Sequence, residues 1–148
     1  MGPLGIRIAG AGVLLLAGLV PMPAGLQSLA GPVPAQVLAV IDGDTLAVRA
    51  HVWLGQTVET KVRLAGIDTP ELRGRCPRER ALAEQARQRL SDAVAGGEVV
   101  LTGIHFGKYA GRVVATVHTP AGQDLAAMLR GAGLARAYRG GGRESWCG

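Results

Sequence analysis

The chain has 148 residues, enough for one domain with its own hydrophobic core. Apolar residues make up 48% of it, which excludes a disordered chain, and aromatic residues only 3%, so the core has to be built from Val, Leu, Ile and Ala. The 16 basic residues, nearly all arginine, outnumber the 11 acidic ones and give a net charge of +5. This excess permits a polyanionic partner, because arginine forms forked contacts with phosphate, but it does not identify one.

Residues 1–35 have the features of an export signal. Arg7 is their only charge, an apolar run follows from Ile8 to Val20, and prolines and small residues come after it. We expect this segment to be cleaved, the folded domain to occupy residues 36–148, and the protein to be secreted or periplasmic. An uncleaved membrane anchor through residues 8–20 is the alternative, although the run is shorter than the roughly 20 residues that span a bilayer. Cleavage sites left open are Ala24, Ala30 and Ala35.

The hydrophobic pattern of the domain predicts five strands and two helices. Alternating apolar residues, typical of half-buried strands, predict strands at 37–41, 46–53, 57–64, 99–106 and 112–118. One helix is expected to begin at Pro77 and end before Gly96, and a second to be capped by Asp124 and to end at Gly131. From Ala135 onward we expect an irregular, basic tail. This order predicts a five-stranded oligonucleotide-binding barrel with helices packed at one end.

Two acidic turns end strand-like runs and are the first candidates for chemistry. Asp44 lies in the turn Asp42–Thr45, and Asp68 and Glu71 bound the turn Asp68–Glu71. Carboxylates that end separate strands can converge on a hard cation such as Ca²⁺ or Mg²⁺, which prefers oxygen ligands. Glu71 could then orient or deprotonate a water molecule. The alternatives are local turn chemistry for the two aspartates and an exposed loop position for the glutamate.

Basic and aromatic side chains could hold a phosphate ester beside those carboxylates. Arg63 comes just before the second acidic turn, and Arg112 follows a predicted hairpin turn that contains Lys108 and Tyr109. Phosphoryl transfer depends mainly on groups that neutralise developing negative charge, which arginines can do. The lysine and tyrosine could contact a phosphate and stack on a base. Each of the four could equally be a solvated surface residue.

The chain contains two cysteines, Cys76 and Cys147. An even count in a chain expected to meet an oxidising compartment favours a disulfide, which would hold the C-terminal tail against the start of the first helix. Two unrelated thiols are the alternative. The two tryptophans, Trp53 and Trp146, are expected to pack inside the fold rather than to stack on a base.

Four short motifs occur in order along the domain. They are VIDGDT (Val40–Thr45), VRLAGIDTPE (Val62–Glu71), KYAGR (Lys108–Arg112) and GLARAY (Gly133–Tyr138). Each is weak alone, but together they resemble the staphylococcal nuclease, or thermonuclease-like, family. The resemblance implies a helix-capped oligonucleotide-binding barrel, a metal-dependent endonuclease that hydrolyses DNA and RNA with Ca²⁺. It implies no stable protein partner, and we expect a monomer.

Carried over by position, the resemblance gives each candidate residue a role. The implied ligands of the metal, with a main-chain carbonyl as the last, are Asp44, Asp68 and Thr69. The implied catalytic side chains, two for the phosphate and one for the attacking water, are Arg63, Arg112 and Glu71. The implied contacts to the nucleotide are Lys108, Tyr109 and Tyr138. Two departures lie in the hairpin: Gly107 replaces a common acidic residue, and Ala110 is an extra residue that could displace Arg112.

The sequence therefore favours a secreted or periplasmic Ca²⁺-dependent nuclease. The alternative is a non-catalytic barrel that binds nucleic acid or another polyanion at the cell envelope, with salt-sensitive binding that a chelator does not affect. All the charged residues of the implied site are present. This favours catalysis, because a site that has lost its activity has no physical reason to keep two aspartates and a glutamate near one another.

Overall fold

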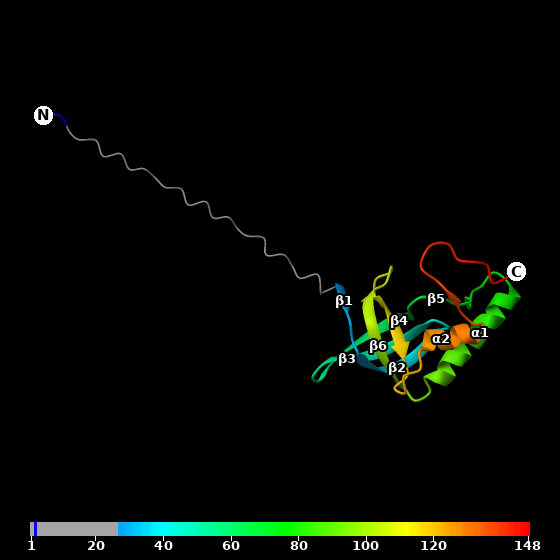
Figure 1. Cartoon of the computed structure of the whole chain (residues 1–148), viewed down its shortest axis with the longest axis horizontal. Coiled ribbons are helices and arrows are strands. Elements are labelled where there is room, and N and C mark those ends of the chain that lie inside the picture. The colour runs from blue at the N-terminus through cyan, green and yellow to red at the C-terminus, as the bar shows by residue number, and fades with distance from the viewer. Residues whose placement is uncertain (1, 3–26) are drawn as a thin grey trace.

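The computed structural model describes residue 2 and residues 27–148 (Figure 1). Most of the expected signal peptide, including residues 8–20, lies outside the described residues. No helix in the described part of the chain is long and apolar enough to cross a membrane. The described fold begins before residue 36, because β1 (Ser28–Leu29) and the first residues of β2 (Val33–Asp42) pair with β6 (Glu98–Phe106).

The longer strands form the closed, mixed barrel that the sequence predicts. Around the barrel, β2 is followed by β3 (Thr45–Trp53), β4 (Gln56–Leu64), β7 (Arg112–His118) and β6, which returns to β2 (Figure 1). The pairing of β4 with β7 is parallel, and the other pairings of the barrel are antiparallel. The five predicted strands are confirmed.

Aliphatic side chains fill the barrel, as the low aromatic content requires. Inward positions alternate along β3, where Leu46, Val48 and Ala50 are buried, and along the end of β4, where Val62 and Leu64 are buried. Burying a leucine or valine side chain contributes about 1.5–3 kcal/mol. The core residues in the described part of the chain run from Ala35 to Trp146, so a polypeptide that begins ahead of β1 contains the whole of this core.

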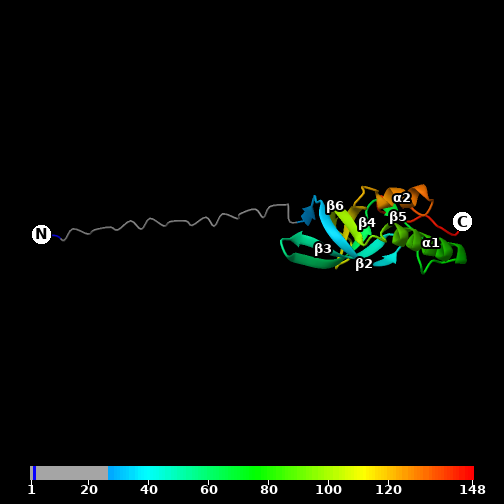
Figure 2. The same cartoon turned by 90° about the horizontal axis from the view of Figure 1, so that it is seen from below.

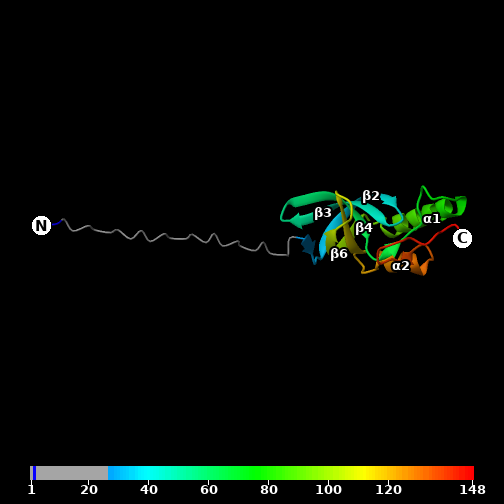
Figure 3. The same ribbon diagram turned by 90° about the horizontal axis from the view of Figure 1, so that it is seen from above.

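Two helices cover one end of the barrel, as predicted. Figures 2 and 3 show α1 (Pro77–Ala93) and α2 (Leu125–Gly131) together at the end opposite β1. Pro77 is the first residue of α1. The buried face of this helix, formed by Ala83, Ala86 and Leu90, packs toward the barrel. Asp124 caps α2, because its Oδ1 accepts a hydrogen bond of 3.0 Å from the main-chain nitrogen of Ala127.

The C-terminal tail is more ordered than expected. Its residues Arg136–Ala137 form β8, which pairs antiparallel with β5 (Ile67–Asp68), so the prediction of an irregular tail was wrong at its start. The tail then runs to the N-terminus of α1. There Cys147 forms a disulfide with Cys76, the N-cap residue of that helix, with the two Cα atoms 5.9 Å apart. The expected disulfide is present.

The two tryptophans differ from each other. Trp146 is 7% exposed, as predicted, but Trp53 is 75% exposed, so the prediction that it packs inside the fold was wrong. Trp53 ends β3 beside the turn to β4, where the hairpin projects beyond the barrel at the end away from the helices (Figure 3). Strand periodicity assigns such a residue to a face, but it does not show whether the strand extends past the core.

Gly43 lets the turn between β2 and β3 lie directly against α1. A Cβ atom at this position would stand 2.7 Å from the Cβ of Ala86 and 3.3 Å from Oγ1 of Thr69. Neither neighbour is the end of a long flexible side chain. The close approach therefore holds the turn that contains Asp44 beside the segment that follows Asp68.

We expect the substitution Gly43→Ala to lower the free energy of unfolding by about 1–3 kcal/mol, because the added methyl group overpacks this contact. Urea unfolding measures the change. The matched control is Gly96→Ala, where a Cβ would meet no atom within 4 Å. That control should stay within about 1 kcal/mol of the original, and equal stability of the two variants would contradict the packing role of Gly43.

Candidate active site

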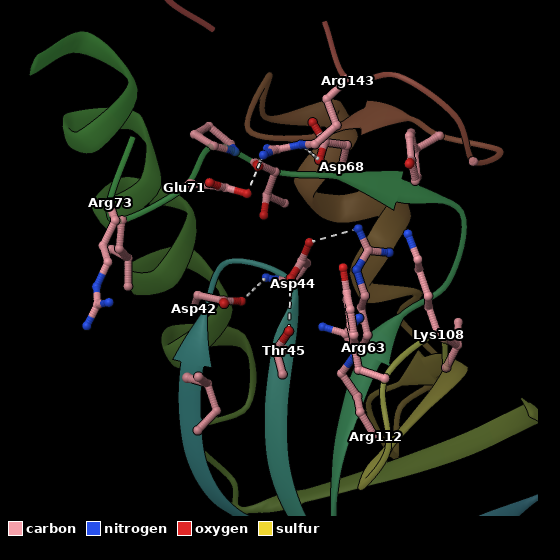
Figure 4. A pocket seen from close by; sticks show the side chains of 18 of the residues that line it. Asp42, Asp44, Thr45, Arg63, Asp68, Glu71, Arg73, Lys108, Arg112 and Arg143 are labelled. Atoms are coloured by element: carbon pink, nitrogen blue, oxygen red, sulfur yellow. Dashed lines mark hydrogen bonds and ion pairs between the residues drawn. The ribbon is translucent and has the colours of Figure 1, made fainter. Parts of the chain in front are cut away.

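One cleft at the helix-covered end of the barrel brings the predicted site residues together (Figure 4). Its volume of about 780 Å³ is sufficient for a nucleotide-sized ligand. All the residues predicted to bind metal, phosphate or nucleotide line it: Asp44, Arg63, Asp68, Thr69, Glu71, Lys108, Tyr109, Arg112 and Tyr138.

The carboxylate of Asp44 is buried in this cleft, with 13% of its side chain exposed. Asp42 has the local turn role, because its Oδ1 accepts a hydrogen bond of 3.1 Å from the main-chain nitrogen of Asp44. Asp44 itself accepts a hydrogen bond of 2.9 Å from the Thr45 hydroxyl and lies 3.3 Å from Nη2 of Arg63. Burial raises the pKa of Asp44 to about 6, although Arg63 opposes this rise.

The second acidic segment starts at the end of β5. Asp68 is the more buried of its acids, with 8% of its side chain exposed, and its Oδ2 accepts a hydrogen bond of 3.2 Å from Nε1 of Trp146. Thr69 and Glu71 line the same cleft, and Figure 4 shows the carboxylate of Glu71 on the side of the cleft that holds Asp68. This acidic segment therefore lies across the cleft from the turn that contains Asp44.

Glu79 is a functional candidate that the sequence did not reveal. It is buried in the first turn of α1, where its Oε1 accepts a hydrogen bond of 3.3 Å from the main-chain nitrogen of Glu71. Its Oε2 accepts one of 3.1 Å from the main-chain nitrogen of Arg75. A Cβ at Gly74 would stand 2.5 Å from Cγ of Glu79. Glu79 thus fixes the loop that carries Glu71.

Basic and aromatic side chains form the other side of the cleft. The guanidinium of Arg63 lies 5.8 Å from the centroid of the Tyr138 ring, and that of Arg112 lies 5.1 Å from the centroid of the Tyr109 ring. Lys108 also lies over Tyr109, at 5.7 Å. Nε of Arg112 is buried and has no hydrogen-bond partner among the described residues. A buried donor without a partner suits a site that receives an anionic group.

The two departures in the hairpin leave Arg112 inside the cleft. The main-chain nitrogen of Gly107 donates a hydrogen bond of 3.0 Å to the carbonyl oxygen of Arg112, and a Cβ at Gly107 would approach that oxygen to 2.9 Å. Glycine therefore permits this tight hairpin. Ala110 is absorbed in the turn, because β7 begins at Arg112, which pairs with Lys61 of β4.

Arg143 enters the cleft from the tail, and the sequence analysis did not assign it to the site. Its Nε lies 2.6 Å from Oδ1 of Asp68, its Nη2 donates a hydrogen bond of 2.9 Å to the carbonyl oxygen of Thr69, and its Nη1 pairs with Oε1 of Glu71. Figure 4 shows the guanidinium between the two carboxylates. Burial alone would lower the pKa of Arg143, but Asp68, Glu71 and Glu79 raise it instead.

The signal that could have found Arg143 is the disulfide. Cys147 follows Arg143 closely in the sequence, and Cys76 follows the second acidic turn closely. A bond between the two cysteines therefore has to bring the segment around Arg143 near that turn. Glycine-rich composition alone gave no indication of where the tail would lie.

The oxygen atoms of the acidic side fit a hard divalent cation. Asp44, Asp68 and the Thr69 carbonyl offer only oxygen ligands, the kind that Ca²⁺ prefers. Asp68, Thr69 and Glu71 already surround one cationic group, the guanidinium of Arg143. The donor set is therefore suited to a positive charge.

A second cluster, formed by Cys76, Glu79 and Cys147, offers ligand atoms within 4.8 Å of one another. The two sulfur atoms are joined in the disulfide, so they provide no thiolate for a metal. The carboxylate of Glu79 accepts main-chain hydrogen bonds instead. This cluster is structural in the oxidised protein.

Comparison with known proteins agrees with the fold. A five-stranded barrel of this topology with helices at one end has the architecture of an oligonucleotide-binding barrel. The model of the staphylococcal nuclease homologue family matches residues 61–145, which is more than half of the chain. The chain belongs to this family. The comparison with curated proteins gave no match.

The turn with Asp44 lies outside the matched residues, and the barrel connects it to them. Thr45 pairs with Arg63 across β3 and β4, and the main-chain nitrogen of Leu64 donates a hydrogen bond of 2.8 Å to the carbonyl oxygen of Asp44. The first acidic turn is thus attached to the strand that the family match includes.

We expect Glu79→Ala to lower the free energy of unfolding by about 1.5–3 kcal/mol, because two main-chain N–H groups lose a charged acceptor. Thermal or urea unfolding of the oxidised protein measures this loss. The matched control is Glu84→Ala on the exposed face of α1, where Glu84 pairs with Arg87. That surface pair should contribute less than about 1 kcal/mol, and a similar loss in both variants would contradict the role of Glu79.

Proposed function

We propose that the protein is a Ca²⁺-dependent nuclease that hydrolyses phosphodiester bonds of DNA and RNA by metal-assisted attack of water. Membership of the family supports the nuclease class. The observation that carries the finer proposal is the cleft itself. It holds the buried Asp68, the part-buried Asp44 and Glu71 on one side and two arginines on the other.

In this proposal Asp44, Asp68 and the carbonyl of Thr69 hold the cation. Ca²⁺ would neutralise charge on the phosphate and favour formation of the nucleophile. The three groups come from two segments that Gly43 allows to approach closely, so their positions are set before any ligand arrives. Such preorganisation is the main contribution that a protein makes in phosphoryl transfer.

Glu71 orients and deprotonates the attacking water in this proposal. Its main-chain nitrogen is held by Glu79, and Figure 4 shows its carboxylate directed into the cleft. Arg63 and Arg112 stabilise the charge that develops on the phosphoryl oxygens. Arg112 lines the cleft, and its buried Nε has no hydrogen-bond partner among the described residues.

Lys108, Tyr109 and Tyr138 bind the nucleic acid chain. Tyr109 is 61% exposed at the edge of the cleft and can stack on a base, and Lys108 beside it can contact a phosphate. Tyr138 lies beneath Arg63 and donates a hydrogen bond of 2.8 Å to the carbonyl oxygen of Gly141. We propose that it positions the arginine and one face of the nucleotide.

We further propose that the protein is exported and acts as a secreted or periplasmic monomer. The disulfide supports an oxidising compartment. Of the three candidate cleavage positions, Ala24 is the one that leaves both β1 and β2 intact. Cleavage after Ala30 would remove β1, and cleavage after Ala35 would also remove the first residues of β2, and both segments pair with β6. We propose cleavage after Ala24.

Mass spectrometry of the mature protein should therefore find Gly25 at its N-terminus. The physical reason is that a shorter product would lose strand pairs of the barrel. Expression of the full chain in a bacterium with an export pathway provides the sample. A mature protein that begins at residue 36, or one that keeps residues 8–20 in the membrane fraction, would contradict this proposal.

We expect residues 25–148 to cleave single-stranded DNA in Ca²⁺ and not in excess chelator. Glu71→Gln and Asp44→Ala should each lower the rate by roughly 100-fold or more, because one removes the base and the other a ligand of the cation. The matched control is Asp92→Ala, an exposed acid on α1, which should keep the original rate. Fluorescence of a labelled oligonucleotide measures cleavage.

A folded protein that binds DNA but does not cut it in Ca²⁺, Mg²⁺ or Mn²⁺ would contradict the nuclease. The non-catalytic barrel would then be the better proposal. Its binding should weaken steeply as salt rises and should not change when chelator is added.

A further inference from the structure

The guanidinium of Arg143 uses the oxygen atoms that the proposed cation needs. It contacts Oδ1 of Asp68 at 2.6 Å, the Thr69 carbonyl at 2.9 Å and the carboxylate of Glu71. The other oxygen of Asp68 accepts the hydrogen bond from Trp146. Both carboxylate oxygens of Asp68 are therefore engaged while the tail is docked.

Other tail arginines do not share this position. Arg136 stacks on Trp146, with its guanidinium 3.8 Å from the ring centroid, and donates a hydrogen bond of 3.0 Å to the carbonyl oxygen of Ser145. Arg139 is exposed and is not among the residues that line the cleft. Arg143 is one-third exposed, so its charge is partly removed from water and its ion pairs are screened less than surface pairs.

The tail is anchored after Arg143 by buried and covalent contacts, whereas before Arg143 it is held more lightly, by a hydrogen bond from the Tyr138 hydroxyl to the carbonyl oxygen of Gly141. After Arg143, Trp146 is buried against Asp68, and Cys147 is joined to Cys76 at the start of α1. Before Arg143 come three glycines, Gly140–Gly142, whose Cβ positions meet no atom within 4 Å. Glycine offers the widest choice of backbone conformations. Arg143 can therefore leave the carboxylates by rotation of the glycine segment while Trp146 and Cys147 stay in place.

From these contacts we infer that Arg143 is a built-in competitor of the divalent cation, held at the site by the Cys76–Cys147 disulfide. A guanidinium and a cation cannot share Oδ1 of Asp68 and the Thr69 carbonyl, since like charges at contact distance repel strongly. Cation binding requires Arg143 to leave. The apparent affinity is then the intrinsic affinity multiplied by the fraction of molecules in which Arg143 is undocked.

The disulfide strengthens this competition because it keeps Arg143 at a high effective concentration beside the carboxylates. Reduction of the bond releases Cys147 from α1 and so lowers that concentration. The strength of cation binding thereby depends on the redox state of the protein. This inference rests on the proposed cation site, but it does not depend on hydrolysis of DNA.

Calorimetric titration of Ca²⁺ into the oxidised protein, residues 25–148, tests the competition. Arg143→Ala should bind Ca²⁺ about tenfold or more tightly than the original protein, which corresponds to about 1.4 kcal/mol. Arg143→Lys keeps the charge but not the forked geometry, so its affinity should lie between the two. Arg139→Ala removes an equal charge from the same tail and should leave the affinity unchanged.

Reduction with a thiol reagent tests the role of the disulfide. The original protein should bind Ca²⁺ more tightly after reduction and so approach Arg143→Ala, whereas the variant itself should change little. This non-additivity is the signature of two features that act through one contact. A general loosening of the fold would instead weaken Ca²⁺ binding in both proteins.

A stability measurement keeps the test independent of misfolding. Arg143→Ala leaves Asp68 and Glu71 without their partner, so its melting temperature in chelator should be lower than that of the original protein. Saturating Ca²⁺ should raise the melting temperature of this variant by more, because tighter binding to the folded state stabilises it more. Circular dichroism at the start of each melt confirms the fold.

Equal or weaker Ca²⁺ binding by Arg143→Ala would overturn the inference, and so would the absence of binding in both proteins. In either case Arg143 is a permanent structural partner of the carboxylates. Tighter binding by the variant without cleavage of DNA by any form would support the inference and contradict the proposed nuclease. The two proposals can therefore fail separately.

Discussion

The structure depends on how its buried carboxylates are compensated. Asp44 and Asp68 are both largely removed from water, and a buried negative charge destabilises a protein unless other groups neutralise or solvate it. Each has its own partners: Arg63 and the Thr45 hydroxyl for Asp44, and the tail for Asp68. The barrel, the N-terminus of α1 and the C-terminal tail meet around the cleft that contains these two carboxylates. Burial raises the pKa of Asp44 to about 6 even though Arg63 opposes the rise, so burial outweighs the ion pair at this carboxylate.

The barrel provides fixed positions for these partners. Parallel pairing of β4 with β7 sets Lys61 opposite Arg112. Arg63, near the end of β4, and Arg112, the first residue of β7, are therefore carried on neighbouring strands and line the same cleft. The acidic segments approach from the helix side, where Gly43 allows the first turn to contact α1 and Glu79 holds the second. Opposite charges are therefore presented by separate rigid elements. The cleft lies between these elements, and in the proposed function it is the cleft that receives the phosphate ester.

Strand and helix positions could be predicted because each element agrees locally with its pattern, as the alternation along β3 and the proline at the start of α1 show. The site residues could be named because short motifs carry them, and the cleft gathers them all. Glu79 could not be found, since a first-turn glutamate is ordinary helix chemistry and only the folded loop gives it two main-chain partners. Arg143 was missed for a different reason, although the expected disulfide could have shown that its segment lies near the second acidic turn. Its role depends on contacts between distant segments, which periodicity does not describe.

The tail joins two requirements that ordinarily conflict. A cation site has to keep its carboxylates available, yet unpaired buried carboxylates weaken the fold before the cation arrives. A tethered arginine meets both needs, since it neutralises Asp68 and Glu71 in the free protein and can be displaced without unfolding of the barrel. The same contacts stabilise the cation-free fold and have to be broken before the cation binds. The free energy by which Arg143 stabilises the fold is therefore subtracted from the free energy of cation binding. The disulfide then sets this balance, since it determines how often Arg143 returns to Asp68 once it has left.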